Sequence, residues 1–207
     1  MRNIVENNSI LDASTEELVK KYIDKFDLDE RYKYGDGAII KLFEAFPDNN
    51  SLEDIILKVS VINELYSTSI YSVFSVAQHI LKCDVDENMR AGNPETVHQI
   101  ATGHDIRTKK HNTEINFYSF ATKYCNWHNQ EDYSIYDSFV EKTLMAYKKR
   151  DSFSEFKKKD LKDFKKFHQV ILDFVEYYNL KGNNAKDIDK FLWIYGKEKF
   201  PPSYEKS

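Results

Sequence analysis

One aspartate in an aromatic-rich stretch is the strongest candidate for chemistry in this sequence. Asp137 follows a helical pattern with small residues and a turn that contains Trp127, His128 and Tyr136. A carboxylate placed there can act as a general base or stabilise developing positive charge. It can equally cap the helix that begins beside it. The residues alone leave both roles of Asp137 open.

Lysines make up the second candidate surface. Residues 148–166 carry nine basic and four acidic side chains, with three phenylalanines between them. Such a surface can neutralise the phosphates of a nucleic acid, whereas a solvated helix face with charge pairs four residues apart is the alternative. The lysines expected to contact nucleic acid, here and on a basic loop at residues 103–112, are Lys109, Lys110, Lys157, Lys158 and Lys159.

The charge of the chain is unevenly distributed. The net charge is −4, yet residues 1–100 have ten basic against eighteen acidic side chains, and residues 101–207 have twenty against sixteen. A polyanionic partner is therefore expected to meet the second half of the chain.

Metal and cofactor chemistry has little support in the sequence. It contains no glycine-rich phosphate loop, no His-Glu-x-x-His, no paired Cys-x-x-Cys and no Gly-x-Ser-x-Gly pattern. Four histidines lie within about thirty residues of one another, but none has the spacing of a helical zinc pair, so we expect them on the surface. They are His98, His104, His111 and His128. We expect no metal and no cofactor.

Cysteine content and hydropathy favour a cytoplasmic location. Cys83 and Cys125 are too few for a disulfide framework, so free thiols are expected. Residues 1–12 are polar and lack the apolar core of a secretory signal. No apolar run reaches the length of a membrane span, so we expect no membrane partner.

The elements that must position these residues are helices. Apolar residues recur at three- and four-residue steps, and the 207 residues include only six Gly and four Pro. We expect an all-α fold, with one domain over residues 1–207 and a compact bundle of about nine helices. A boundary near residues 83–93 is expected to divide two lobes with a cleft between them.

Capping signals place the ends of the expected helices. Ser14 and Glu17 form a capping box, and Asn93 before Pro94 opens a short helix. The other expected helix starts are at Ala38, Ser51, Ile70, Thr113, Asp137, Ser152 and Ala185. The helix that begins at residue 152 is expected to run to about residue 179 as one unbroken element.

The stretch around Asp137 resembles a known enzyme family. A helix, Trp127-His128-Asn129, an aromatic-rich turn and Tyr136-Asp137-Ser138 together look like the catalytic half of the helix-hairpin-helix DNA base-excision glycosylases, relatives of the 8-oxoguanine enzymes. In that family the essential aspartate opens the helix after such a turn, and Asp137 is the matching position. Residues 52–66 are similar in placement to an early central helix that presents a polar residue to the cleft, which here would be Asn63. The resemblance covers residues 50–145.

The resemblance implies a monofunctional glycosylase. Asp137 would activate water or stabilise charge on the deoxyribose while an extruded base occupies an aromatic pocket. The lysine nucleophile of bifunctional members would fall near Phe117 or Tyr118, and Lys123 lies one to two helical turns away, so lyase activity is not expected. The residues expected to form the base pocket are Asn63, Tyr118, Trp127, His128 and Tyr136.

One difference from the family's sequence pattern favours a second possible function. The family's hairpin reads Leu-Pro-Gly-Val-Gly or similar, whereas residues 109–115 contain no glycine. This favours a non-catalytic helical interaction or regulatory protein on a glycosylase-like scaffold. A two-metal nuclease would need paired acidic clusters that the sequence lacks. Duplex DNA is the expected partner, with the target base, the choice of DNA or RNA and the oligomeric state left open.

Overall fold

The helical pattern of the sequence is realised in an all-α fold. The structure is a computed structural model that describes residues 11–201. Over these residues it has ten α-helices, one short 3-10 helix and no strand, apart from an isolated antiparallel bridge between Arg107 and Glu114. The helices are α1 (Glu16–Leu28), α2 (Glu30–Ala45), α3 (Leu52–Tyr66), α4 (Val73–Cys83), α5 (Asp86–Arg90), α6 (Glu95–Ala101), α7 (Tyr118–His128), α8 (Ser138–Asp151), η1 (Lys158–Lys162), α9 (Phe164–Tyr177) and α10 (Ala185–Lys199).

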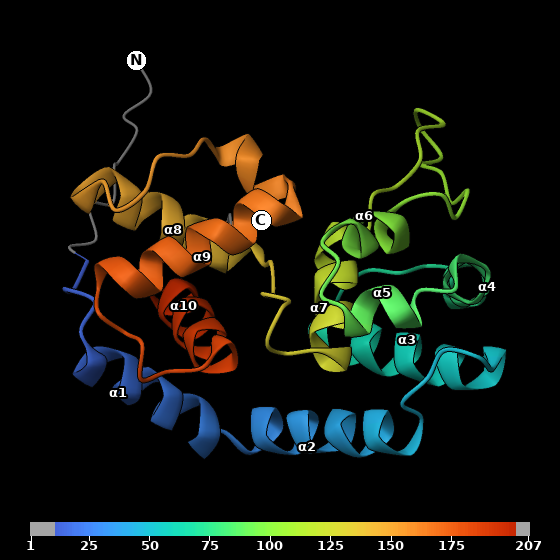
Figure 1. The fold of residues 1–207 in the computed structure, drawn as a ribbon, viewed down its shortest axis with the longest axis horizontal. Helices are drawn as coiled ribbons and strands as arrows, with labels where there is room; N and C mark the ends of the chain where they lie inside the picture. The colour runs from blue at the N-terminus through green and yellow to red at the C-terminus, as the bar shows by residue number, and fades with distance from the viewer. Residues whose placement is uncertain (1–10, 202–207) are drawn as a thin grey trace, which may run out of the picture.

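The helices form two groups (Figure 1). In the first group α10 packs against both α8 and α1, and η1 packs on α9. The second group contains α2 to α7, in which α3 packs on α4 and α6 packs on α7. The chain therefore begins in the first group, passes through the second, and returns to the first after α7.

The return of the chain brings α1 and α10 together. The ring of Tyr22 on α1 contacts those of Phe191 and Tyr195 on α10, at centroid distances of 6.0 and 5.2 Å. Edge contacts of this kind add to the free energy gained by burying the rings. Residues 83–93, where we expected a boundary between lobes, form α5 and its flanks and lie within the second group. The chain instead crosses between the groups at Asp29 and at residues 129–137.

Most helix starts follow the capping signals. The side chain of Ser51 accepts a hydrogen bond from the Asp54 amide, as predicted, and Asn184 caps α10. The first helix is capped by Thr15 and not by Ser14. In each case a side-chain oxygen satisfies one of the amides that a helix leaves without an internal partner.

The helix expected from Ala38 begins earlier, at Glu30, where Asp29 caps it. Two other expected helices are also wrong at their starts. Residues 152–179 do not form one helix, because Ser152 ends α8 in the left-handed conformation and Asp163 caps a new helix, α9. The helix expected from Thr113 begins only at Tyr118, since Ile115 pairs its amide with the carbonyl of Ile106. In both segments local hydrogen bonds to the backbone compete with the helix.

Glycine at position 196 decides how closely α10 approaches α8. A Cβ built there would lie 2.4 Å from Thr143 Oγ1 and 2.7 Å from the carbonyl oxygen of Phe139, whereas a Cβ on Gly37 would meet nothing within 4 Å. We therefore expect Gly196→Ala to lower the free energy of unfolding by about 1–3 kcal/mol through overpacking. Gly37→Ala, in the middle of α2, should raise it by up to about 1 kcal/mol through helix propensity. Urea denaturation of the two variants checks this, and equal stabilities would contradict it.

Candidate functional site

A cavity of about 470 Å³ lies where the two groups of helices meet. Residues from α1, α2, α3, α7, α8 and α10 line it, together with the turn before α8. Its charged side chains are Arg31, Asp36, Lys123, Asp137, Lys186, Asp189 and Lys197, and its aromatic ones are Phe26, Tyr32, Tyr66, Phe139 and Trp193. Buried acids and bases beside aromatic walls make it the leading candidate for a functional site.

Asp137 both caps a helix and faces this cavity. Its Oδ1 accepts a hydrogen bond of 2.9 Å from the amide of Phe139, so the capping role is confirmed. Its Oδ2 lies 3.7 Å from Nζ of Lys123, and its side chain is 22% exposed. Oδ1 of Asp137 thus caps α8, while Oδ2 lies near Lys123 on the cavity wall.

Lys123 is the partner that sequence reasoning missed. Its side chain is only 2% exposed, and Nζ donates to Ser119 Oγ at 2.8 Å and to the carbonyl oxygen of Tyr136 at 3.0 Å. Burial lowers the pKa of Lys123, while the carboxylates of Asp137 and Asp189 oppose that change. The sequence set Lys123 aside only as a nucleophile, because it lies one to two helical turns from Phe117 and Tyr118, and its contact with Asp137 was not predicted.

A second lysine bridges the two groups of helices. Lys186 comes from α10, is 11% exposed, and places Nζ 3.5 Å from Asp36 Oδ2 and 3.3 Å from Tyr66 Oη. The same ammonium lies 4.5 Å from the centre of the Trp127 ring, a cation–π contact. Burial also raises the pKa of Asp189 to about 6, although Lys186 and Lys123 act against this. No sequence signal joins these side chains, because they come from four elements.

The residues predicted to form a base pocket do not gather at the cavity. Trp127 comes nearest, since its Nε1 donates to Tyr66 Oη at 3.2 Å. Tyr118 stacks near His98 and packs against Tyr136 at 5.1 Å, and neither tyrosine is a lining residue of the cavity.

The other two predicted pocket residues bind loops. Oδ1 of Asn63 accepts from the amide of Ile70 at 2.8 Å and from the hydroxyl of Thr68 at 2.9 Å, which fixes the segment after α3. His128 lies in the interior beside Asn49, whose Nδ2 is 3.3 Å from Nε2 of the histidine. These contacts are structural in character.

The predicted nucleic-acid lysines lie on two separate segments (Figure 1). Lys157, Lys158 and Lys159 begin η1, and Nζ of Lys158 pairs with the Glu141 carboxylate at 3.0 Å. Lys109 and Lys110 are exposed on the long connection between α6 and α7. Because Glu141 compensates the charge of Lys158, we regard Lys157 and Lys159 as the more available cations of η1.

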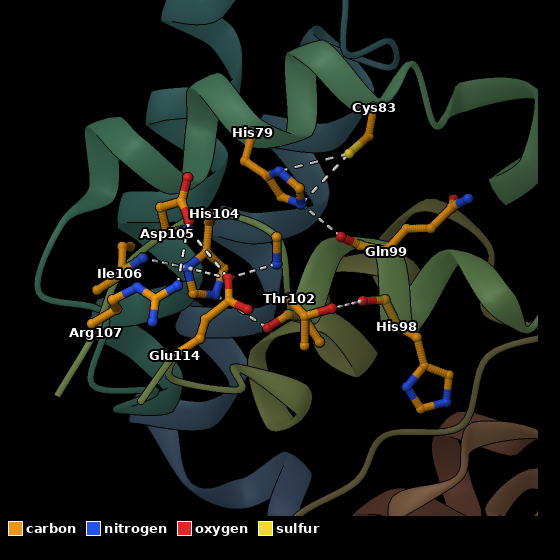
Figure 2. Close-up of polar contacts among 12 residues, drawn as sticks. His79, Cys83, His98, Gln99, Thr102, His104, Asp105, Ile106, Arg107 and Glu114 are labelled. Atoms are coloured by element: carbon orange, nitrogen blue, oxygen red, sulfur yellow. Dashed lines mark hydrogen bonds and ion pairs between the residues drawn. The ribbon is translucent and has the colours of Figure 1, made fainter. Parts of the chain in front are cut away.

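That connection is more ordered than its basic composition suggested (Figure 2). The carboxylate of Glu114 accepts hydrogen bonds from the amides of Gly103 at 2.7 Å and Asp105 at 3.2 Å. His104 is buried against Phe117, with a ring separation of 4.7 Å, so its expected surface position is wrong. Its Nδ1 accepts from the amide of Ile106 at 3.1 Å, which makes it a structural residue of the loop.

Residues 11–201 contain neither a cluster of metal ligands nor a membrane-spanning helix. In this range no group of three or more His, Cys, Asp or Glu side chains is arranged to hold a metal ion. Over the same range no helix combines the length and the apolar character that crossing a membrane requires. Cys83 and Cys125 are free thiols, as predicted, and Cys125 is buried.

Comparison with known proteins places the chain in a family. Residues 18–132 match the model of the family HI_0787_N, described as an N-terminal domain. The chain belongs to this family. A protein of Haemophilus influenzae, described as an uncharacterized protein, is 40% identical over 157 residues, which is 75% of this chain and 73% of that relative. No solved structure matches the chain. The range of the family match includes Asp36, Tyr66 and Lys123 and ends before Asp137.

The buried imidazole of His128 predicts a loss of stability in acid. Burial lowers the pKa of His128 from 6.5 to about 3. Between these two pH values His128 is protonated in the unfolded chain and neutral in the folded protein. The contribution of His128 to the free energy of unfolding should be fully present above pH 6.5. It should fall between pH 6.5 and 3, by up to about 1.4 kcal/mol per pH unit. Urea denaturation against pH measures it. His128→Gln should flatten the slope of unfolding free energy against pH. His111→Gln, on the exposed loop, should leave that slope unchanged. Identical slopes for the two variants would contradict the role given to His128.

Proposed function

We propose that the protein is a monofunctional base-excision glycosylase that hydrolyses the bond between a base and its sugar in nucleic acid. The observation that carries this proposal is the Asp137 carboxylate, 3.7 Å from the Lys123 ammonium, on the wall of a cavity of about 470 Å³ between two groups of helices. A glycosylase needs a nucleotide turned out of its stack and received in such a pocket. This agrees with the family resemblance of the stretch around Asp137.

The proposed reaction uses the free side of Asp137. Its Oδ2 can accept a proton from the attacking water or stabilise the positive charge that develops on the sugar. The Lys123 ammonium, 3.7 Å from Oδ2, and the Phe139 amide, 2.9 Å from Oδ1, hold the carboxylate from two sides. Asp137 is thus held in one orientation before the substrate arrives.

Lys123 supports the carboxylate and does not attack the sugar. Its Nζ donates hydrogen bonds to the hydroxyl and the carbonyl of Ser119 and to the carbonyl of Tyr136. A lysine nucleophile needs a free lone pair, which an ammonium with three acceptors and a neighbouring carboxylate does not offer. The proposed products are therefore a free base and an abasic site, without strand cleavage.

Replacement of Asp137 should abolish base release. We expect Asp137→Asn to lower the rate by about 100-fold or more, since asparagine still caps α8 but cannot accept a proton. The matched control is Asp163→Asn, because Asp163 Oδ1 also caps its helix by accepting from the amide of Lys166 and does not line the cavity. Release of bases from duplexes containing 8-oxoguanine, uracil or hypoxanthine is the measurement. Equal rates for the Asp137 variant and the unchanged protein would remove this residue from the mechanism.

Nucleic-acid binding is expected to use the lysines of η1. Charge reversal of Lys157 and Lys159 together should weaken binding to a short duplex and reduce the slope of log affinity against log salt by about two, one for each lost phosphate contact. Fluorescence anisotropy at several salt concentrations measures both quantities. Lys41→Glu, an exposed lysine on α2, is the control. Binding that does not respond to salt would contradict the interface.

A non-catalytic role as an interaction or regulatory protein is the second candidate. The specific observation in its favour is Glu114, whose carboxylate occupies the amides of Gly103 and Asp105 (Figure 2). Amides engaged in this way do not bind a DNA phosphate. Absence of duplex binding at low salt would favour this candidate and turn attention to protein partners in the cytoplasm, where we place the protein.

A further inference from the structure

Tyr66 occupies the junction between the two groups of helices. It is the last residue of α3, in the second group, and it lines the cavity. Its phenol oxygen accepts the indole N–H of Trp127 at 3.2 Å, from α7, and an N–H of Lys186 at 3.3 Å, from α10. Two donors from separate elements therefore converge on one oxygen (Figure 1 shows the three helices).

This arrangement leaves the phenol proton available to a ligand. A tyrosine hydroxyl has two lone pairs and one proton, and here both lone pairs face donors. Among residues 11–201, the Tyr66 hydroxyl accepts these two hydrogen bonds and donates none, although the side chain is partly buried on the cavity wall. Burial raises the pKa of Tyr66 to about 12, against the opposing effect of Lys186, so the group keeps its proton at neutral pH.

The two donors would reduce the cost of the phenolate that proton transfer leaves behind, although burial and the carboxylates of Asp36 and Asp189 still disfavour it. Lys186 lies 3.3 Å from Oη and is fixed from its other side by Asp36 at 3.5 Å. The ammonium of Lys123 lies 5.5 Å from the centre of the Tyr66 ring. Donors that are fixed before the reaction and point at the developing negative charge contribute most to catalysis.

We propose that Tyr66 is the general acid that protonates the departing base. The inference rests on the proposed glycosylase function. The Tyr66 O–H bond breaks and its proton moves to a ring nitrogen of the base, while the electron pair of the bond between base and sugar leaves with the base. Water adds to C1′ of the sugar and gives its proton to Asp137. Asp137 then returns this proton through solvent to the Tyr66 phenolate, so atoms and charge balance.

The proposal assigns separate roles to the charged groups around the cavity. Asp137 acts on the water and the sugar, and Tyr66 acts on the base. Lys186 is a positioning residue, because it acts on the reaction through the Tyr66 oxygen. A base is a poor leaving group as an anion, and general acid catalysis is worth about 10²–10⁴-fold in rate. The cavity then contains both halves of a hydrolytic mechanism.

The test separates base release from binding. Tyr66→Phe should lower the rate of base release by about 100-fold on the duplex, among those containing 8-oxoguanine, uracil, hypoxanthine or 7-methylguanine, that the unchanged protein cleaves fastest. Affinity for a duplex with a tetrahydrofuran abasic analogue should stay within about twofold, because that ligand has no base to protonate. Tyr71→Phe, an 83% exposed tyrosine on the surface, is the matched control and should leave both quantities unchanged.

The outcomes distinguish this proposal from the function on which it rests. If Tyr66→Phe releases bases within about threefold of the unchanged protein, or loses affinity for the abasic analogue in proportion to rate, Tyr66 is not the acid. In that case Asp137→Asn should still abolish release, and the proposed function stands. If the unchanged protein releases no base from any of the four duplexes, both proposals fall. A smaller loss for Tyr66→Phe on 7-methylguanine, whose ring is already cationic, would further support proton transfer to the base.

Discussion

The buried ammonium of Lys123 is the constraint on which the site depends. A charge at 2% exposure is stable only if nearby groups replace the water it has lost. The groups that do so are the hydroxyl and carbonyl of Ser119, the carbonyl of Tyr136 and the carboxylate of Asp137. By binding both α7 and the turn before α8, Lys123 fixes where that turn runs and so points Asp137 into the cavity.

Lys186 is a second lysine of low exposure, and its contacts connect the two groups of helices. Lys186 belongs to α10, which packs on α1 and α8, yet its ammonium is bound by Asp36 and Tyr66 of the second group. Removing one partner of such a cluster leaves an uncompensated buried charge, which costs more than the pair contributes. Electrostatic contacts of Lys186 therefore join α10 to the second group, and Asp36, Lys186 and Asp137 all line the cavity.

Local signals in the sequence were sufficient for the fold class and for several helix ends. Ser51, Asn93 and Asp137 bind the backbone within three residues, so their effect can be predicted from a short window. The apolar periodicity over residues 152–179 predicted one helix, which was wrong. The helix α8 ends at Ser152, where φ is 52°, and the apolar pattern gives no sign of that break. The cavity could not be predicted at all beyond Asp137. Its side chains come from α1, α2, α3, α7, α8 and α10, and only tertiary packing brings them together.

The capping and chemical roles of Asp137 are compatible for a physical reason. The hydrogen bond from the Phe139 amide uses Oδ1 and fixes the carboxylate plane, which leaves Oδ2 directed toward Lys123 and the cavity. The same hydrogen bond satisfies an amide that the start of α8 would otherwise leave without a partner. In the proposed reaction, a carboxylate held in one orientation has little to reorganise when water approaches. The cap is thus compatible with the proposed role of Asp137, because it orients the carboxylate that faces the cavity.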